Sequence, residues 1–228
     1  GAGDGRLLAY EERGDFGCIS AEFEDGLVTF RRTLVVTPHY MIHEFHADTQ
    51  PDEDRYWTPR HGDQPMYASR VDLPWHVDGV LEGLTLAPEP KHPLANVEAG
   101  DFTRGWSSAM MPDTPVRLRA KAGRRSLDVS FLTQEARIVR ATGPGQPASQ
   151  ERPFYIVRFS FGQPTLRTLT AWNPAVETTA FDLDHLQLTV SGERHTHSRT
   201  PRGWRIETVG DRETQTVELA GAVPTPAP

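Results

Sequence analysis

The chain has 228 residues, of which 37% are hydrophobic and 24% are charged, which is enough apolar material for one large β domain or two small domains. Its net charge of −7 argues against binding to nucleic acids or to anionic membranes, because both partners require a basic surface. No apolar run reaches the roughly 18 residues that a membrane-spanning helix requires. The single cysteine, Cys18, excludes an internal disulfide and is expected to be a small buried residue.

The two ends of the chain differ in composition from its middle. Residues 1–5 are glycine-rich and resemble a linker or a processed end, and residues 223–228 form a stiff proline-rich tail. No signal-peptide pattern is present. We expect a single β-sandwich domain over residues 1–222, in a mature protein or in a C-terminal part of a longer one. A periplasmic or extracellular location is favoured.

Apolar and polar residues alternate with a period of two along most of the chain, which predicts β-strands. The first predicted hairpin joins residues 19–24 to residues 27–36 through Asp25 and Gly26, and a further strand follows at residues 39–47. Glycine- and proline-containing turns separate the later strands, and no amphipathic helix exceeds about two turns. These later strands are expected at residues 66–71, 77–86, 116–120, 127–132, 136–141, 154–161, 166–172, 186–191, 204–209 and 214–219. The pattern predicts an all-β fold with little helix, an antiparallel β-sandwich of super-sandwich-like type with long loops.

Two long loops, at residues 48–65 and 87–111, carry aromatic and charged side chains. An aromatic face can cover the apolar side of a sugar ring while charged neighbours bind its hydroxyl groups. The alternative is that the tryptophans pack into small cores beneath their own loops. The candidate substrate-binding residues are Tyr56, Trp57, Arg104 and Trp106.

Histidines provide the candidate metal ligands. In extended strands His195 and His197 share one face, whereas His43 lies on the face opposite to that of His46 and Asp48. Two imidazoles at positions i and i+2 can share one zinc or copper ion, and a third ligand would come from elsewhere. The candidate third ligands are His46, Asp48, His61 and Asp63. The alternative is that these histidines are surface or core residues without metal.

Arginines cluster at three places, Arg31-Arg32, Arg117-x-Arg119 and Arg124-Arg125. They predict either a solvated outer face or a groove that binds an acidic polysaccharide.

Residues 23–44, which read FEDGLVTFRRTLVVTPHYMIHE, resemble a strand pair in the C-terminal β-sandwich of heparinase II/III-like polysaccharide lyases. Strands at residues 127–172 are compatible with the same sandwich. The resemblance implies a domain that binds acidic polysaccharide or packs on a helical catalytic domain, which in that family carries most of the substrate cleft. If this chain is itself catalytic, the lyase chemistry would need His43 or His46 as base, Tyr40 as acid and Arg60 to neutralise the uronate carboxylate.

Residues 39–48, which read HYMIHEFHAD, are also similar to the copper-binding strand of Cu/Zn superoxide dismutases, His-x-His-Glu-Phe-Gly-Asp. Met41 stands in place of the first histidine of that motif. This resemblance implies a copper- or zinc-binding β-sandwich that could be redox-active. A third hypothesis is a structural or interaction domain of an exported assembly.

Overall fold

The computed structural model describes residues 5–25, 28–49, 70–75, 79–82, 84–89, 103–112, 114–122, 125–133, 136–144, 151–160, 165–211 and 213–220. Antiparallel β-strands make up most of these residues, and no helix occurs among them. The predicted all-β antiparallel fold is therefore confirmed. The described residues contain no helix that is long and apolar enough to cross a membrane.

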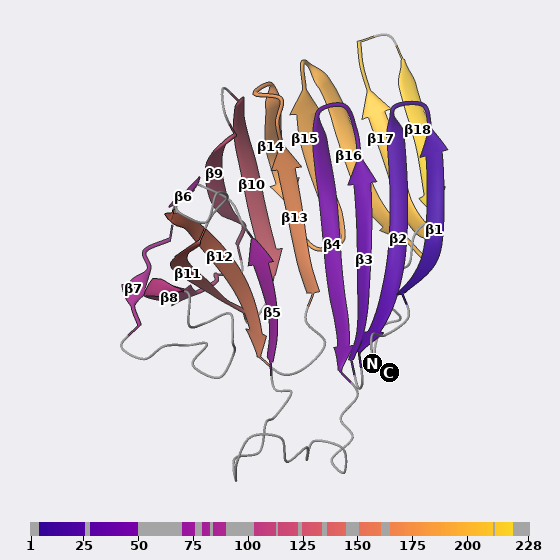
Figure 1. Cartoon of the computed structure of the whole chain (residues 1–228). Coiled ribbons are helices and arrows are strands. Elements are labelled where there is room, and N and C mark those ends of the chain that lie inside the picture. Colours follow the sequence, from indigo (N-terminus) through magenta and orange to yellow (C-terminus); the bar gives the residue numbers. More distant parts are fainter. Residues whose placement is uncertain are drawn as a thin grey trace.

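The described strands form three sheets. The central sheet has eight strands in the order β1-β2-β3-β4-β13-β10-β9-β6 (Figure 1). Its strands are β1 (Gly5–Arg13), β2 (Phe16–Asp25), β3 (Val28–Val36), β4 (Tyr40–Thr49), β6 (Gly79–Glu82), β9 (Val116–Ala122), β10 (Arg125–Thr133) and β13 (Thr165–Ala171).

Two smaller sheets flank the central sheet. The β11 sheet, in the order β5-β12-β11-β8-β7, comprises β5 (Arg70–Trp75), β7 (Ala87–Pro88), β8 (Arg104–Met110), β11 (Ala136–Pro144) and β12 (Glu151–Ser160). The β16 sheet runs in chain order and comprises β14 (Val176–Phe181), β15 (His185–Val190), β16 (Glu193–Thr200), β17 (Gly203–Val209) and β18 (Thr214–Ala220).

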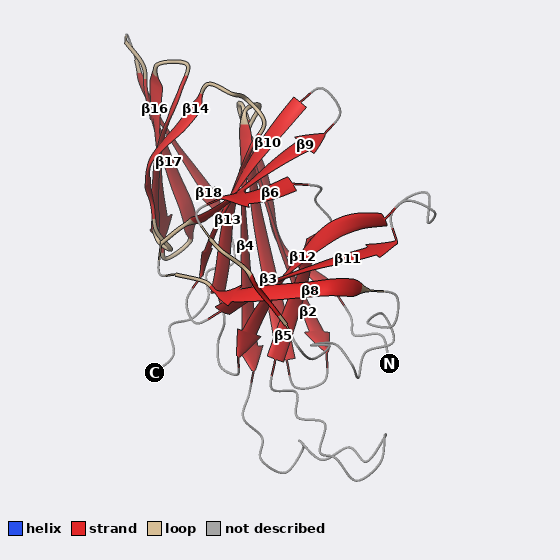
Figure 2. Cartoon of the chain, turned by 90° about the vertical axis from the view of Figure 1, so that its left-hand side faces the viewer, coloured by secondary structure: helices blue, strands red, loops and turns tan. Residues whose placement is uncertain are grey.

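The flanking sheets pack on opposite faces of the central sheet. Ile42 of β4 lies in a core with Leu188 and Ile206 of the β16 sheet, whereas Phe45 lies in a core with Ile138 and Phe159 of the β11 sheet. Residues three apart on a strand point to opposite faces, so the central sheet is the middle of three layers. Figure 2 shows β14, β16 and β17 on one side of the central strands and β8, β11 and β12 on the other.

The flanking sheets are offset, so each leaves part of the central sheet uncovered by described residues. The core beneath the β16 sheet draws on β2, β3, β4 and β13, whereas the core beneath the β11 sheet draws on β4, β9, β10 and β13. On the first face, β9 and β10 therefore form a ledge beside β14. On the second face, β1 to β3 form a ledge that is rich in exposed large hydrophobic residues, which are Leu7, Tyr10, Ile19, Phe23 and Val36.

Several strands differ from the sequence prediction. Strand β1 was not predicted, and its first residue, Gly5, belongs to the segment expected to be a linker. Strand β8 lies within the loop expected at residues 87–111. Strand β14 was not predicted. Bulges explain two of these differences, because register shifts between Leu7 and Ala9 in β1 and between Thr178 and Ala180 in β14 interrupt the period-two pattern.

Candidate functional site

A seam of polar side chains crosses the interior between the central sheet and the β16 sheet. From β4 it contains Tyr40 and Glu44, which lie on the same strand face because they are four residues apart. From β16 it contains the alternating residues His195, His197 and Arg199. The period-two pattern of both strands therefore turns these groups toward each other across the sandwich.

Tyr40 joins the two histidines of the seam. Its hydroxyl oxygen lies 3.0 Å from Nδ1 of His195 and 2.6 Å from Nε2 of His197, and all three side chains are buried. The hydroxyl donates to one ring and accepts an N–H from the other. Among the residues that the structure describes, Nε2 of His195 and Nδ1 of His197 find no hydrogen-bond partner. The Glu193 carboxylate oxygen lies 3.8 Å from His195 Nε2.

The pKa shifts of this cluster follow from burial. Desolvation raises the pKa of Tyr40 and lowers the pKa of both His195 and His197. The cationic Arg167 further lowers the pKa of His197, and Glu193 opposes the shift at His195. All three groups are therefore neutral near pH 7, and they act as a hydrogen-bonded part of the core.

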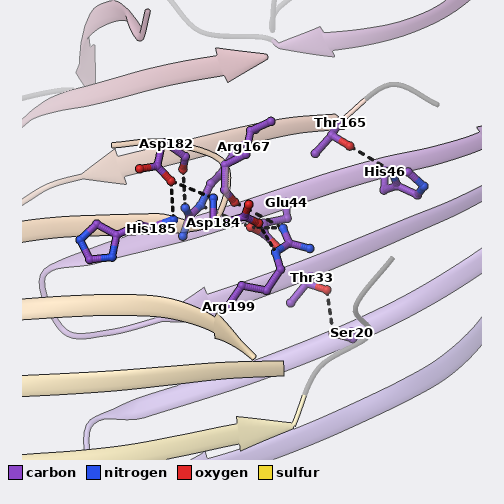
Figure 3. Close-up of polar contacts among 11 residues, drawn as sticks. Ser20, Thr33, Glu44, His46, Thr165, Arg167, Asp182, Asp184, His185 and Arg199 are labelled. Atoms are coloured by element: carbon purple, nitrogen blue, oxygen red, sulfur yellow. Dashed lines mark hydrogen bonds and ion pairs between the residues drawn. The ribbon is translucent and has the colours of Figure 1, made fainter. Parts of the chain in front are cut away.

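Glu44 is the centre of a second buried cluster, shown in Figure 3. Arg199 donates to its Oε1 over 3.0 Å, and Nε of Arg167 lies 3.3 Å from the same oxygen. Arg199 also pairs with Asp184 at 3.1 Å, and the Arg167 guanidinium lies 4.6 Å from the ring centroid of Trp204. Because these residues come from β4, β13 and the β16 sheet, the cluster ties the two layers together.

Burial sets the protonation of this cluster as well. Desolvation lowers the pKa of the fully buried Arg167 to about 10, so the guanidinium remains charged at neutral pH. Desolvation also acts to raise the pKa of Glu44, and Arg167 and Arg199 oppose it. The arrangement is a structural ion-pair cluster whose centre, Glu44 and Arg167, is buried, whereas Asp184 lies at the surface.

The candidate catalytic residues lie apart from one another. Tyr40 points into the β16 side of the central sheet and has no exposed surface, whereas His43 points to the opposite face, 5.9 Å between ring centroids from Trp75. Burial lowers the pKa of His43 to about 4. His46 lies on the same face as Tyr40 but six residues along the strand, or about 20 Å away. Arg60 lies outside the described residues.

His46 is half-buried, and its Nδ1 lies 3.0 Å from the Thr165 hydroxyl, as Figure 3 shows. Burial lowers its pKa, and Asp48 acts in the opposite direction. Of the histidines proposed as base, it is the one with partial exposure. No general acid from the predicted set lies beside it.

The candidate metal ligands are brought together only in part. His195 and His197 share an inward face, as predicted, but the Tyr40 hydroxyl lies between their nearest nitrogens. His46 lies about 20 Å from Tyr40 along β4, and Asp48 lies further still. Across the parts of the chain that the structure describes, no three His, Cys, Asp or Glu residues lie close enough to hold a metal ion. His61 and Asp63 lie outside those parts, and the zinc or copper site stays a prediction.

The candidate sugar-binding aromatics do not form an exposed platform among the described residues. Trp106 belongs to β8, is 8% exposed, and packs edge-to-face against Phe154 at 6.0 Å between ring centroids. Trp106 therefore packs into a small core, which was the alternative to sugar binding, but this core lies on a strand of the β11 sheet rather than beneath a loop. Arg104 is exposed and forms an ion pair with Glu151. Tyr56 and Trp57 lie outside the described residues.

A groove of about 660 Å³ lies where the β16 sheet ends and the ledge of β9 and β10 begins. One wall is the edge of β14, which pairs with no other described strand on that side, and the floor is the face of β9, β10 and β13. Polar groups come from both sides, and an apolar strip lies along β13 and the turn before β14. The polar lining residues are Arg117, Asp128, Ser130, Glu177, Thr178 and Thr179, and the apolar ones include Leu169, Ala171, Pro174 and Phe181.

Sequence reasoning found one member of this groove, Arg117, through the Arg117-x-Arg119 pattern. It missed the wall contributed by Glu177 to Thr179, because β14 is polar, short and bulged. The turn signal Asn173-Pro174 marks the approach to that wall, but nothing local to it indicates that β14 faces β10.

No protein-family model matches the chain, and no curated protein matches it.

Proposed function

We propose that the protein is a carbohydrate-binding β-sandwich domain, of the kind that accompanies a helical catalytic domain in heparinase II/III-like polysaccharide lyases. The observation that carries the proposal is the groove along β14. Resemblance of residues 23–44 to a strand pair of that lyase sandwich adds support. The fold alone would add no support, because β-sandwiches serve many functions.

The groove has the properties that a glycan requires. Its volume of about 660 Å³ is that of an ordinary small-ligand site. Hydroxyl, carboxylate and guanidinium groups line it, and these groups exchange hydrogen bonds with sugar hydroxyls. Pro174 and Val176, which are exposed or half-buried, offer an apolar strip for the C–H face of a sugar ring. Strands rather than loops hold most of these groups, so the site is preformed.

Binding is favoured over catalysis by this chain alone. Tyr40 has no exposed surface, and His43 is buried on the other face of the sheet. A substrate could reach neither without separation of two packed layers. The domain would therefore hold a glycan while a partner domain performs the chemistry.

The test is a groove-filling substitution. Ser130→Trp places an indole on the groove floor, and Thr216→Trp places one on β18, at the far edge of the β16 sheet. Binding to a panel of neutral and acidic polysaccharides is measured by affinity electrophoresis and calorimetry. We expect S130W to lose binding by at least about tenfold while T216W retains it. Equal binding by both variants, or no binding by the unmodified protein, contradicts the proposal.

A further inference from the structure

We infer that the groove along β14 selects uncharged glycan chains over acidic ones. The inference rests on the proposed function and assigns the ligand class of that same site. It differs from the expectation of an acidic polysaccharide that the arginine pairs and the lyase resemblance raise.

The charges that line the groove do not favour an anion. Among the described lining residues one cation, Arg117, stands against two anions, Asp128 and Glu177, which leaves a net charge of −1. The whole chain, at −7, adds no long-range attraction for a polyanion.

The one cation is already paired. Arg117 Nη2 lies 2.5 Å from Asp128 Oδ2, and Arg119, the next residue on the same face, lies 3.3 Å from Asp128 Oδ1. Arg119 also lies 3.2 Å from Glu82. A uronate carboxylate that approached the remaining N–H donors of these half-exposed guanidinium groups would lie close to Asp128, which is a like charge.

The opposite wall adds a second repulsive group. Glu177 is exposed on β14 and forms no ion pair within the described part of the chain. An acidic chain in the groove would therefore lie between two carboxylates. Selection against a ligand by such like charges is a common source of specificity.

A neutral chain meets complementary groups instead. Sugar hydroxyls donate to Asp128 and Glu177, and they accept from the hydroxyls of Ser130 and Thr178. The Thr179 hydroxyl donates to the Gln187 carbonyl, so it serves a sugar as an acceptor. The Arg117–Asp128 pair can stay intact while each partner bonds a hydroxyl. No charge has to be buried without its counterion.

A matched pair of polymers tests the inference. Polygalacturonate and its fully methyl-esterified form share a backbone and differ in charge. We expect the intact chain to bind the neutral ester at least about tenfold more tightly, since a like-charge contact costing about 1.4 kcal/mol lowers affinity tenfold. Affinity for the ester should change little between roughly 50 and 200 mM salt, because a neutral chain has no charge for the salt to screen.

Variants connect the preference to the two carboxylates. The double substitution D128N/E177Q should narrow the preference by raising affinity for the acid polymer, whereas E218Q, on the remote strand β18, should leave it unchanged. Tighter or equal binding of the acid polymer by the unmodified protein overturns the inference and leaves the glycan-binding proposal standing. Binding of neither polymer, nor of any other member of the panel, overturns both.

Discussion

The Tyr40 hydroxyl satisfies two buried imidazoles at once, and it does so only while at least one of the imidazoles is neutral. It lies within 3.0 Å of His195 Nδ1 and 2.6 Å of His197 Nε2. Each hydrogen bond has a donor and an acceptor only because one ring presents a bare nitrogen to the hydroxyl. The role of Tyr40 is therefore structural, at the junction of the central sheet and the β16 sheet.

Removal of that hydroxyl should destabilise the fold. Tyr40→Phe removes the shared partner of two buried ring nitrogens, His195 Nδ1 and His197 Nε2, and leaving a buried polar group unpaired costs about 1–3 kcal/mol. We expect the free energy of unfolding, measured by urea denaturation, to fall by that amount. The control is Tyr10→Phe, because the Tyr10 hydroxyl bonds Glu12 on the exposed surface. Equal stabilities of the two variants would contradict the role assigned to Tyr40.

Buried histidines should make stability depend on pH. Burial lowers the pKa of His43 from its usual 6.5 to about 4 and lowers those of His195 and His197. Below pH 6.5 the unfolded chain takes up protons that the folded chain does not, so the free energy of unfolding falls as the pH falls. For His43 this loss accumulates between pH 6.5 and about 4. Urea denaturation at pH 7.5, 6 and 5 measures it.

The histidine contribution can be separated from others. His43→Gln should reduce the loss of stability between pH 7.5 and pH 5, because the substituted residue no longer titrates. A flat stability profile in the unmodified protein, or a rise on acidification, would show that these histidines are not held neutral.

Glu44 should be a far more sensitive position than an exposed carboxylate. Glu44→Gln removes the anion that neutralises the buried Arg167 and Arg199, a loss of about 3–5 kcal/mol for a buried pair. The matched control is Glu218→Gln, which breaks the exposed pair with Arg205 and costs about 0–1 kcal/mol. Thermal and urea denaturation compare the two. A Glu44→Gln variant as stable as the control would show that the cluster does not hold the sheets together.

At the scale of single elements, the turn between β15 and β16 places the paired histidines. Ser191 and Gly192 have φ angles of 51° and 94°, so both occupy the left-handed region that two-residue hairpin turns require. This turn fixes the register that pairs Leu188 with His195 and Leu186 with His197. The inward direction of both imidazoles therefore depends on a glycine.

Gly192→Ala tests this dependence. A Cβ meets no atom within 4 Å there, so its cost comes from the backbone conformation alone, about 1 kcal/mol or more. Gly17→Ala is the control, because Gly17 lacks a positive φ and its Cβ would meet Glu12 Cγ only at 4.0 Å. We expect G192A to lower the urea midpoint and G17A to leave it nearly unchanged. A reversed order would contradict the turn geometry.

Elements with regular alternation could be predicted from sequence, and those with bulges could not. Asp25-Gly26 predicts the hairpin of β2 and β3, and the structure pairs Asp25 with Val28. Period two also places His195 and His197 on one face correctly. The bulge in β14 and the left-handed Gly105 in β8 break the pattern, so those strands were missed.

The groove could not be predicted because it depends on sheet order. Strands β13 and β10 are neighbours in the central sheet although a hairpin of the β11 sheet separates them in sequence. The groove beside β14 can be located only when that order and the offset of the β16 sheet are known. A sequence pattern predicts on which face of its strand a residue lies, but it does not predict which strand or sheet packs against that face.

At the scale of the molecule, three offset layers produce two ledges with different chemistry. The ledge of β9 and β10 carries the ladder of Arg117, Arg119 and Asp128, whereas the ledge of β1 to β3 is rich in exposed large hydrophobic residues. A polar ledge next to a free strand edge suits a hydroxyl-rich chain. A glycan is therefore expected to bind on the first ledge, along β14.

Amide hydrogen exchange with and without a neutral oligosaccharide tests that claim most directly, because it locates the ligand without altering the protein. We predict slower exchange in β14 and in the facing strands β9 and β10, with β17, β18 and the ledge of β1 to β3 unchanged. Protection of the β1 to β3 ledge or of the region around His46, or no protection by any glycan that binds, would contradict the account.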